Sequence, residues 1–188
     1  MGQEDKLLTQ PIPKLLRDIA IPASTGMFFN TMYNIVDTFY AGLISTEALA
    51  GLSLSFTFFF IIIGVGYGFS SAIISLIGNA MGARKRLLAT IYAHKGVIFI
   101  PLLGVFLTVI GYFFAPKMFM FLGASGAYLE VTTDYMNIIL YGTIFFMFNF
   151  ALNAILVSKG DTKTYRNPLI FGFFATLILK PLIIYGLR

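Results

Sequence analysis

Five long apolar runs constrain the fold of this chain more than any other feature of its sequence. Each run exceeds the apolar length of an ordinary core helix, and a helix that crosses a bilayer needs about 20 such residues. Strands of a membrane barrel are about 10 residues long and alternate in polarity, which these runs do not. The runs predict an all-α polytopic membrane protein with about five transmembrane helices, at about residues 14–42, 48–77, 96–116, 128–157 and 165–187.

The composition supports a membrane protein and excludes several kinds of site. Charged residues make up 11% of the chain, against about 25% in soluble domains. There is no cysteine, which excludes disulfides and thiol chemistry. The one histidine, His94, cannot build a metal cluster alone. We therefore expect no metal site and no cofactor.

The basic residues are distributed unevenly between the ends of the runs. With a cytoplasmic N-terminus, the outer loops hold only Lys117, and this asymmetry follows the positive-inside rule. It predicts a multi-pass protein of the cell (inner) membrane whose residues 1–13 are cytoplasmic. The lipid bilayer is then the expected partner, and the net charge of +5 needs no nucleic acid to explain it. The basic residues assigned to the cytoplasmic side are Lys6, Lys14, Arg17, Arg84, Lys85, Arg86, Lys95, Lys159, Lys163 and Arg166.

Asp37 lies inside the first apolar run. A carboxylate in hydrocarbon costs at least about 2.5 kcal/mol and persists where it faces a protein interior or a water-filled cavity. Asp37 is therefore a candidate functional group within the membrane. The alternative is a position at headgroup level, at the end of the helix. Pro22 in the same run removes one backbone hydrogen bond and acts either as a hinge or as a static bend.

Two features predict how the second and third runs begin and pack. Ser45 or Thr46 can cap the second helix. Gly64 and Gly68 have the four-residue spacing of small residues that let membrane helices approach closely, so we place them at a helix contact. After the basic turn at residues 84–86, we expect an amphipathic piece up to about Lys95, followed by the third span.

Four short motifs follow one another at the ends of the predicted helices. They are Tyr33-Asn34-Xaa-Xaa-Asp37-Thr38 with Gly42, Gly78-Asn79-Ala80-Met81-Gly82, Gly160-Asp161-Thr162-Lys163, and Leu179-Xaa-Pro181 with Gly186. Together they resemble the multidrug and toxic compound extrusion (MATE) family. The resemblance covers nearly the whole chain. It implies most of one six-helix lobe, an N-terminal lobe at residues 14–188 that is truncated before its sixth helix.

The resemblance also implies roles for individual residues. Asp37 matches a coupling-ion site of the N-terminal lobe, and Tyr33 matches a tyrosine that lines the lobe. Pro22 matches a bending proline. Asn153 matches an asparagine on the fourth helix, with Asn149 as the alternative.

The fifth run departs from the family pattern. Many members carry Asn-Xaa-Xaa-Leu-Asp-Pro there, whereas this chain has Thr176 at the asparagine position and Lys180 at the aspartate position. A lysine in place of a second carboxylate makes a proton the expected coupling ion rather than sodium. Asp37 is ~30 Å of helix beyond Arg17 and Lys180 ~21 Å beyond Arg166, at 1.5 Å per residue. Since intramembrane charges pair, we predict a Lys180–Asp37 pair. The alternative is that Lys180 extends to the outer headgroups.

The sequence bears on three classes of function: an exporter, a structural or assembly protein, and an enzyme. The resemblance implies a secondary active exporter of organic drugs or toxic compounds by cation antiport, with small, often cationic substrates and a second lobe or half-transporter as its partner. The alternative is a truncated or non-transporting structural or assembly protein derived from such a lobe. An enzyme is not expected, since the chain carries no HExxH or GxSxG motif and no paired catalytic carboxylates on one helix face.

Overall fold

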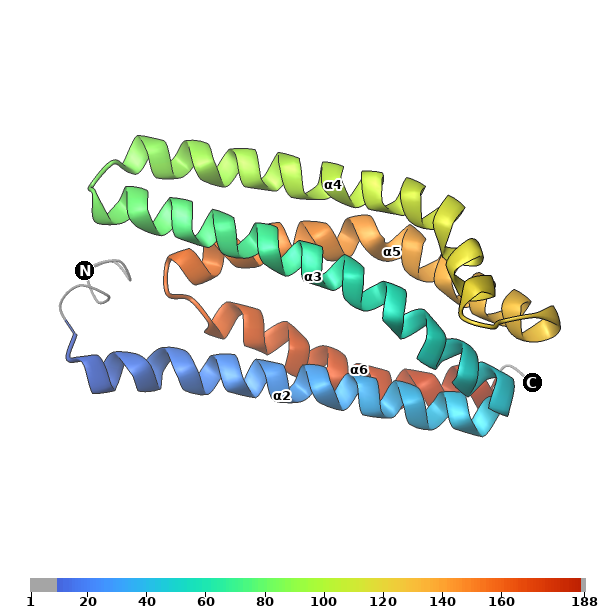
Figure 1. Cartoon of the computed structure of the whole chain (residues 1–188). Helices are drawn as coiled ribbons and strands as arrows, with labels where there is room; N and C mark the ends of the chain where they lie inside the picture. The colour runs from blue at the N-terminus through green and yellow to red at the C-terminus, as the bar shows by residue number, and fades with distance from the viewer. Residues whose placement is uncertain (1–9, 187–188) are drawn as a thin grey trace. The chain divides into compact units, whose positions relative to one another are not determined.

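The computed structural model describes residues 10–186, without the side chains of Glu47 and Tyr185. Within that range it contains five helices and no strand, which confirms the all-α fold class. Figure 1 labels them in chain order. They are α2 (Ile12–Ile44), α3 (Thr46–Gly82), α4 (Arg86–Phe121), α5 (Gly126–Ser158) and α6 (Lys163–Gly186).

Four of these helices, α3 to α6, are long and apolar enough to cross a membrane. The remaining helix, α2, has the length for a span at 33 residues, but polar side chains such as Asn30, Asn34 and Asp37 are spread along it. Large apolar side chains on the outer faces of the helices suit contact with lipid tails. Phe106 and Phe113 of α4, for example, are 58% and 63% exposed.

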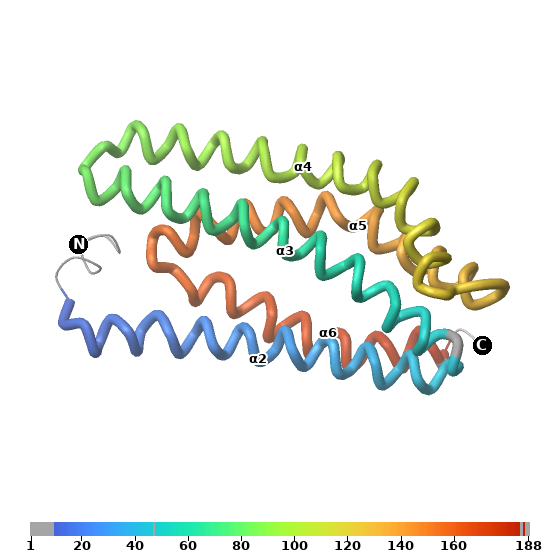
Figure 2. The backbone as a smooth tube through the Cα atoms, viewed as in Figure 1, coloured from blue at the N-terminus to red at the C-terminus, as the bar shows by residue number. Residues whose placement is uncertain are grey.

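The described part of the chain divides into two compact units, and residues 10–40 with 156–186 form the first. Here α2 and α6 lie side by side, as the tube in Figure 2 shows. Contacts advance along both helices in the same direction, so the two helices are parallel. The Thr162 hydroxyl donates to the Ile19 carbonyl at 3.4 Å, and further along the rings of Phe29 and Phe173 meet edge to face at 5.4 Å.

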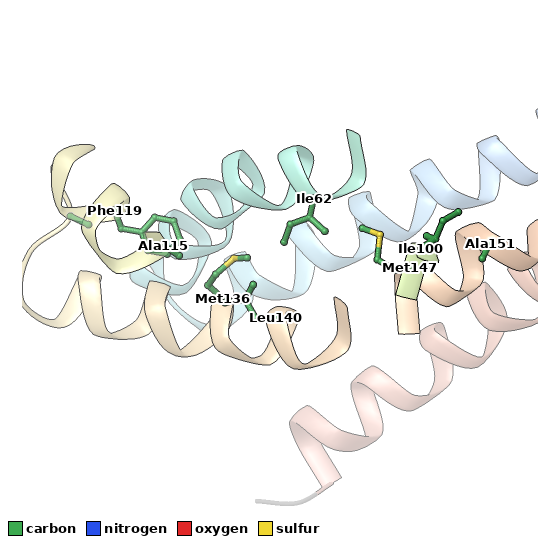
Figure 3. Packing of buried hydrophobic residues seen from close by; sticks show 9 residues of the cluster. Ile62, Ile100, Ala115, Phe119, Met136, Leu140, Met147 and Ala151 are labelled. Atoms are coloured by element: carbon green, nitrogen blue, oxygen red, sulfur yellow. The ribbon is translucent and has the colours of Figure 1, made fainter. Parts of the chain in front are cut away.

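Residues 41–155 form the second unit, with α3, α4 and most of α5. Its core is a cluster of buried side chains drawn from all three helices (Figure 3). The bulkiest of them are Ile62 of α3, Ile100 and Phe119 of α4, and Met136 and Met147 of α5. Close packing of these side chains provides dispersion contacts that do not depend on water.

Hydroxyl groups in the second unit donate across helix contacts. Ser55 and Ser70 of α3 donate to the carbonyls of Thr132 and Phe150 on α5, at 3.4 and 3.2 Å. Thr108 of α4 donates to the Leu140 carbonyl on α5 at 3.0 Å. Such bonds satisfy polar groups that would otherwise face hydrocarbon. They show that α5 runs parallel to α3 and antiparallel to α4.

The predicted close-packing pair on α3 is wrong. A methyl group added at Gly64 or Gly68 would meet no atom within 4 Å. Gly66, between them, is the buried glycine, and a methyl group there would lie 2.6 Å from the Phe150 ring. The sequence spacing of small residues does not tell how a helix is rotated about its axis. It therefore pointed to Gly64 and Gly68, although Gly66 is the glycine that faces α5.

Replacing Gly66 by valine is therefore expected to destabilise the second unit, whereas Gly64→Val should leave its stability nearly unchanged. Overpacking of this kind costs about 1–3 kcal/mol. Thermal unfolding of the two variants in detergent measures the difference. Equal melting temperatures for both variants would show that the α3–α5 contact does not lie at Gly66.

The helix ends differ in part from expectation. Ser45 is the cap of α3, and its hydroxyl accepts from the Ala48 N–H at 3.0 Å. The amphipathic piece up to Lys95 and the third span belong to the same helix, since α4 is continuous from Arg86. Pro101 and Pro116 lie inside it, because neighbouring helices can stabilise a membrane helix that has lost a backbone hydrogen bond at proline.

The connection between α5 and α6 holds a carboxylate that caps α6. Asp161 accepts hydrogen bonds from the hydroxyl and the backbone N–H of Thr164, at 2.6 and 3.0 Å. These bonds, the hydroxyl bond first, lower the pKa of the Asp161 carboxyl below its usual 3.8. Gly160 precedes it with φ 75°, a left-handed conformation that favours glycine at a helix end.

Asp161→Ala is expected to destabilise the chain by about 1 kcal/mol at neutral pH, through loss of the cap. Because the folded-state pKa lies below the unfolded-state value, the ionised carboxylate stabilises the fold above pH 3.8. That contribution disappears as the pH falls through the folded-state pKa. The stability difference between the native chain and the variant should therefore be smaller at pH ~3 than at pH 7; an unchanged difference would contradict the assignment.

Candidate functional site

The charged centre of the site is an ion pair between α2 and α6. The Lys180 Nζ contacts the Asp37 Oδ1, which confirms the predicted pairing of these two residues. Both side chains are partly buried: the side chain of Lys180 is 26% exposed and that of Asp37 is 37% exposed. Because α2 and α6 run parallel, the two predicted charges meet at the same depth along the first unit.

The ring of Tyr40 lies near the pair and is not among the site residues predicted from the sequence. The Lys180 Nζ lies 5.9 Å from the centre of the Tyr40 ring, within the range of a cation–π contact. Tyr40 follows Asp37 by three residues on the same helix, and residues at that spacing share a helix face. This spacing was available in the sequence and would have identified Tyr40 as a second partner for the lysine.

Tyr33 lies one turn before Asp37 and packs against α6. Its hydroxyl occupies the space that a side chain at position 172 would fill, so this close approach requires Gly172. Its ring meets the edge of Phe173 at 6.0 Å and 81°. Tyr33 of α2 therefore faces Gly172 of α6, and Asp37 of α2 faces Lys180 of α6. The two α2 residues are four positions apart and the two α6 residues are eight positions apart.

Thr176 lies halfway between Gly172 and Lys180 and is half-buried. Residues four apart on a helix are neighbours on its surface, so Thr176 belongs to the same row of α6. The structure thus brings four predicted residues, Tyr33, Asp37, Thr176 and Lys180, to one helix pair.

Asn153 belongs to α5 in the second unit. Its amide oxygen is buried and has no hydrogen-bond partner among the described residues. The competing residue, Asn149, is exposed. The place of Asn153 in the ion site stays a prediction.

Pro22 is buried within α2, which continues through it from Ile12 to Ile44. One turn later, Gly26 lets α2 approach Leu169 and Tyr165 of α6, where an added methyl group would lie 3.4 and 3.7 Å away. The hinge role of Pro22 stays a prediction.

The chemistry that the site can perform follows from its charges. Among the described residues, no group of three or more histidine, cysteine or acidic side chains could hold a metal ion. The Asp37 carboxylate instead has a tethered counter-ion, the Lys180 ammonium. Another cation, or a proton, can occupy that carboxylate oxygen only in exchange for the lysine. The pair is therefore suited to exchange.

Curated relatives cover this chain along its length. An "FAD transporter" of Shewanella oneidensis is 28% identical over 187 residues, which are 100% of this chain and 41% of the relative. A "Probable multidrug resistance protein YoeA" of Bacillus subtilis is 31% identical over 144 residues, 77% of this chain and 31% of the relative. The chain thus spans about two fifths of the first relative's length and less of the second.

Solved structures share the fold. A MATE protein in its bent conformation superposes with a TM-score of 0.91 at 28% identity, over 100% of this chain and 42% of that chain. A transporter of the MOP superfamily from Pyrococcus furiosus gives a TM-score of 0.89 at 29% identity, over 97% of this chain and 40% of that chain.

The family pattern named MatE matches residues 22–183, which include both members of the ion pair. Together with the helix order and the motifs at the helix ends, this match shows that the chain belongs to the MatE family, whose members are the multidrug and toxic compound extrusion transporters that its sequence resembles.

Proposed function

We propose that this chain acts as the N-terminal lobe of a secondary active multidrug exporter, which moves organic drugs or toxic compounds outward in exchange for an inward cation. The observation that carries the proposal is the Asp37–Lys180 pair on the neighbouring long helices α2 and α6. Ionisable groups within a membrane are costly and are typical of ion and substrate pathways. Membership of the MatE family supports the same function.

The coupling ion is a proton rather than sodium. Hard cations bind to sets of oxygen ligands, and the Lys180 ammonium occupies an oxygen of the one carboxylate in this site. A proton needs a single oxygen and neutralises the carboxylate fully. Tyr33 and Thr176 carry hydroxyl groups one helical turn from Asp37 and Lys180 along the chain, and Asn153 is the further predicted member of the ion site.

A second lobe completes the transporter. In secondary transporters, substrate sites lie between repeats near the midplane, and access alternates as one repeat moves against the other. The chain covers about 40% of the solved relatives, so a second lobe or half-transporter is its proposed partner. Pro22 is the proposed hinge of α2. The substrates are small organic molecules, often cationic, since Asp37 is the acceptor for a positive group.

The test is substrate-dependent proton flux. A complete transporter that carries these 188 residues as its N-terminal lobe is reconstituted into vesicles with a pH-sensitive dye inside. Addition of a small organic substrate should change the internal pH, with ethidium as the cationic probe and tryptophan as the zwitterionic probe, and a sodium gradient should not replace the proton gradient. Substrate movement without proton movement would contradict proton coupling. Absence of both would favour the alternative, a structural or assembly protein.

The proposed location is the cell membrane with the N-terminus in the cytoplasm. The basic turn at residues 84–86 and the connection at 159–163 then face the cytoplasm, as the positive-inside rule requires. Because the chain has no cysteine, Lys85→Cys and Lys163→Cys give single labelling sites. An impermeant maleimide should leave both unlabelled in intact cells and label a Lys117→Cys variant. Rapid labelling at position 85 or 163 would reverse the topology.

A further inference from the structure

The ion pair gives the site two opposite charges in direct contact, and each charge already has its partner. We propose that this arrangement selects zwitterionic substrates: organic molecules that carry a cationic and an anionic group close together. The inference rests on the proposed export function and names the substrate class of the same site.

The argument begins with a substrate that carries only a positive charge. The Lys180 Nζ contacts one oxygen of the Asp37 carboxylate, so the ammonium group of such a substrate either displaces the lysine or lies beside its like charge. A displaced lysine keeps its charge and loses its ionic partner. The Tyr40 ring, 5.9 Å from the Nζ in the intact pair, does not neutralise that charge. An unpaired charge away from water is strongly unfavourable, so the pair opposes a simple cation.

A substrate with only a negative charge meets the mirror-image problem. It meets the Lys180 ammonium either beside the like charge of Asp37 or in place of Asp37, and in the second case the carboxylate is left without a counter-ion. The described part of the site gives Asp37 no second basic partner, because Lys180 is the one basic residue of the α2–α6 contact at this level. The pair therefore opposes simple anions as well.

A zwitterion removes both penalties at once. Its ammonium group replaces Lys180 at Asp37, and its carboxylate or phosphate replaces Asp37 at Lys180. Two ion pairs then stand where one stood, and the net charge of the site is unchanged. Removing one partner of a desolvated pair costs much more than exchanging both partners, so selection for paired charges follows from the geometry.

The surroundings suit an organic zwitterion with an aromatic part. The exposed fractions of the two charged side chains, 26% and 37%, leave room for a ligand to reach them. The Tyr40 ring lies near the Lys180 ammonium, and the rings of Tyr33 and Phe173 pack together further along the same two helices. Aromatic faces provide large apolar contact area with preferred ring–ring geometries.

The same arrangement agrees with exchange against protons. Lys180 is the charged group that faces Asp37 from α6, and Tyr33 and Tyr40 flank it on α2. A proton on Asp37 takes away the partner of the substrate ammonium and leaves that ammonium beside the Lys180 charge. Proton and zwitterion therefore compete for one carboxylate, which is the requirement for antiport.

Three indole compounds test the proposal: tryptophan, a zwitterion, tryptamine, a cation, and indole-3-propionate, an anion. The chain contains no tryptophan, so indole fluorescence reports the ligand alone. Fluorescence anisotropy is measured with the purified chain in lipid nanodiscs, and empty nanodiscs correct for partition into lipid. The native chain should bind tryptophan at least tenfold more tightly than either single-charge analogue.

Matched variants assign the selection to the pair. Lys180→Met should shift the preference to tryptamine, Asp37→Asn should shift it to indole-3-propionate, and the control Lys117→Met should keep the native order. Each variant is compared only in its monodisperse fraction. If a variant does not fold, the native chain still decides the question. Tryptamine binding as tight as tryptophan binding, or no binding of any probe, overturns the proposal.

The outcome separates this inference from the export function. Proton-coupled export of ethidium by the complete transporter without a preference for tryptophan would refute zwitterion selection and leave the function intact. Tightly selective tryptophan binding in a protein that moves no substrate would refute the function and leave the site assignment intact.

Discussion

Replacing Lys180 by leucine is expected to lower the free energy of unfolding by about 3 kcal/mol. The substitution leaves the Asp37 carboxylate without its partner between α2 and α6, and breaking one side of a buried ion pair costs about 3–5 kcal/mol. The low end of this range applies because the Asp37 side chain is 37% exposed. The Tyr40 ring also loses the lysine that lies 5.9 Å from its centre.

A double-mutant cycle isolates the pair from these other losses. Asp37→Asn alone should also destabilise the chain, because it leaves the lysine charge unpaired. The double variant should recover part of the loss, since neither charge then remains without a partner. Unfolding of the four proteins in one detergent measures the coupling energy. If the two losses simply add, Lys180 and Asp37 do not interact in the folded protein.

The pairing could be predicted because it depends on distances along helices. Each residue advances a helix by 1.5 Å, so the positions of Arg17 and Arg166 relative to the two charges allow both Asp37 and Lys180 to lie in the outer half of the bundle. The cost of an isolated charge in hydrocarbon then gives a reason for them to meet. The five-helix fold followed in the same way from the length of the apolar runs.

Contacts that depend on the rotation of a helix about its axis could not be predicted. Gly64 and Gly68 have the spacing of a packing motif, yet Gly66 is the residue that meets Phe150. The fit of the Tyr33 hydroxyl against Gly172 is of the same kind, since nothing in the sequence pairs these two positions. Similarly, α4 begins at Arg86, before the predicted span at residues 96–116, because a polar stretch can end a membrane span without ending the helix.

Asp37→Asn is expected to abolish proton-coupled export in a complete transporter that carries this lobe. Asparagine has nearly the shape of aspartate and cannot exchange a proton at this position. It therefore removes the one carboxylate of the α2–α6 site while the helices can still pack. Proton flux on addition of substrate should fall to the level of protein-free vesicles.

Asp18→Asn is the matched control, because Asp18 is an exposed aspartate near the start of the same helix. It changes the net charge by the same amount and lies away from Lys180, so its proton flux should equal that of the native transporter. Equal protein content of the vesicles shows that both variants insert. Undiminished export by Asp37→Asn with an unchanged pH profile would place the proton site elsewhere. The contact with Lys180 would then be a purely structural ion pair, which the unfolding experiments would still detect and the transport experiments would not.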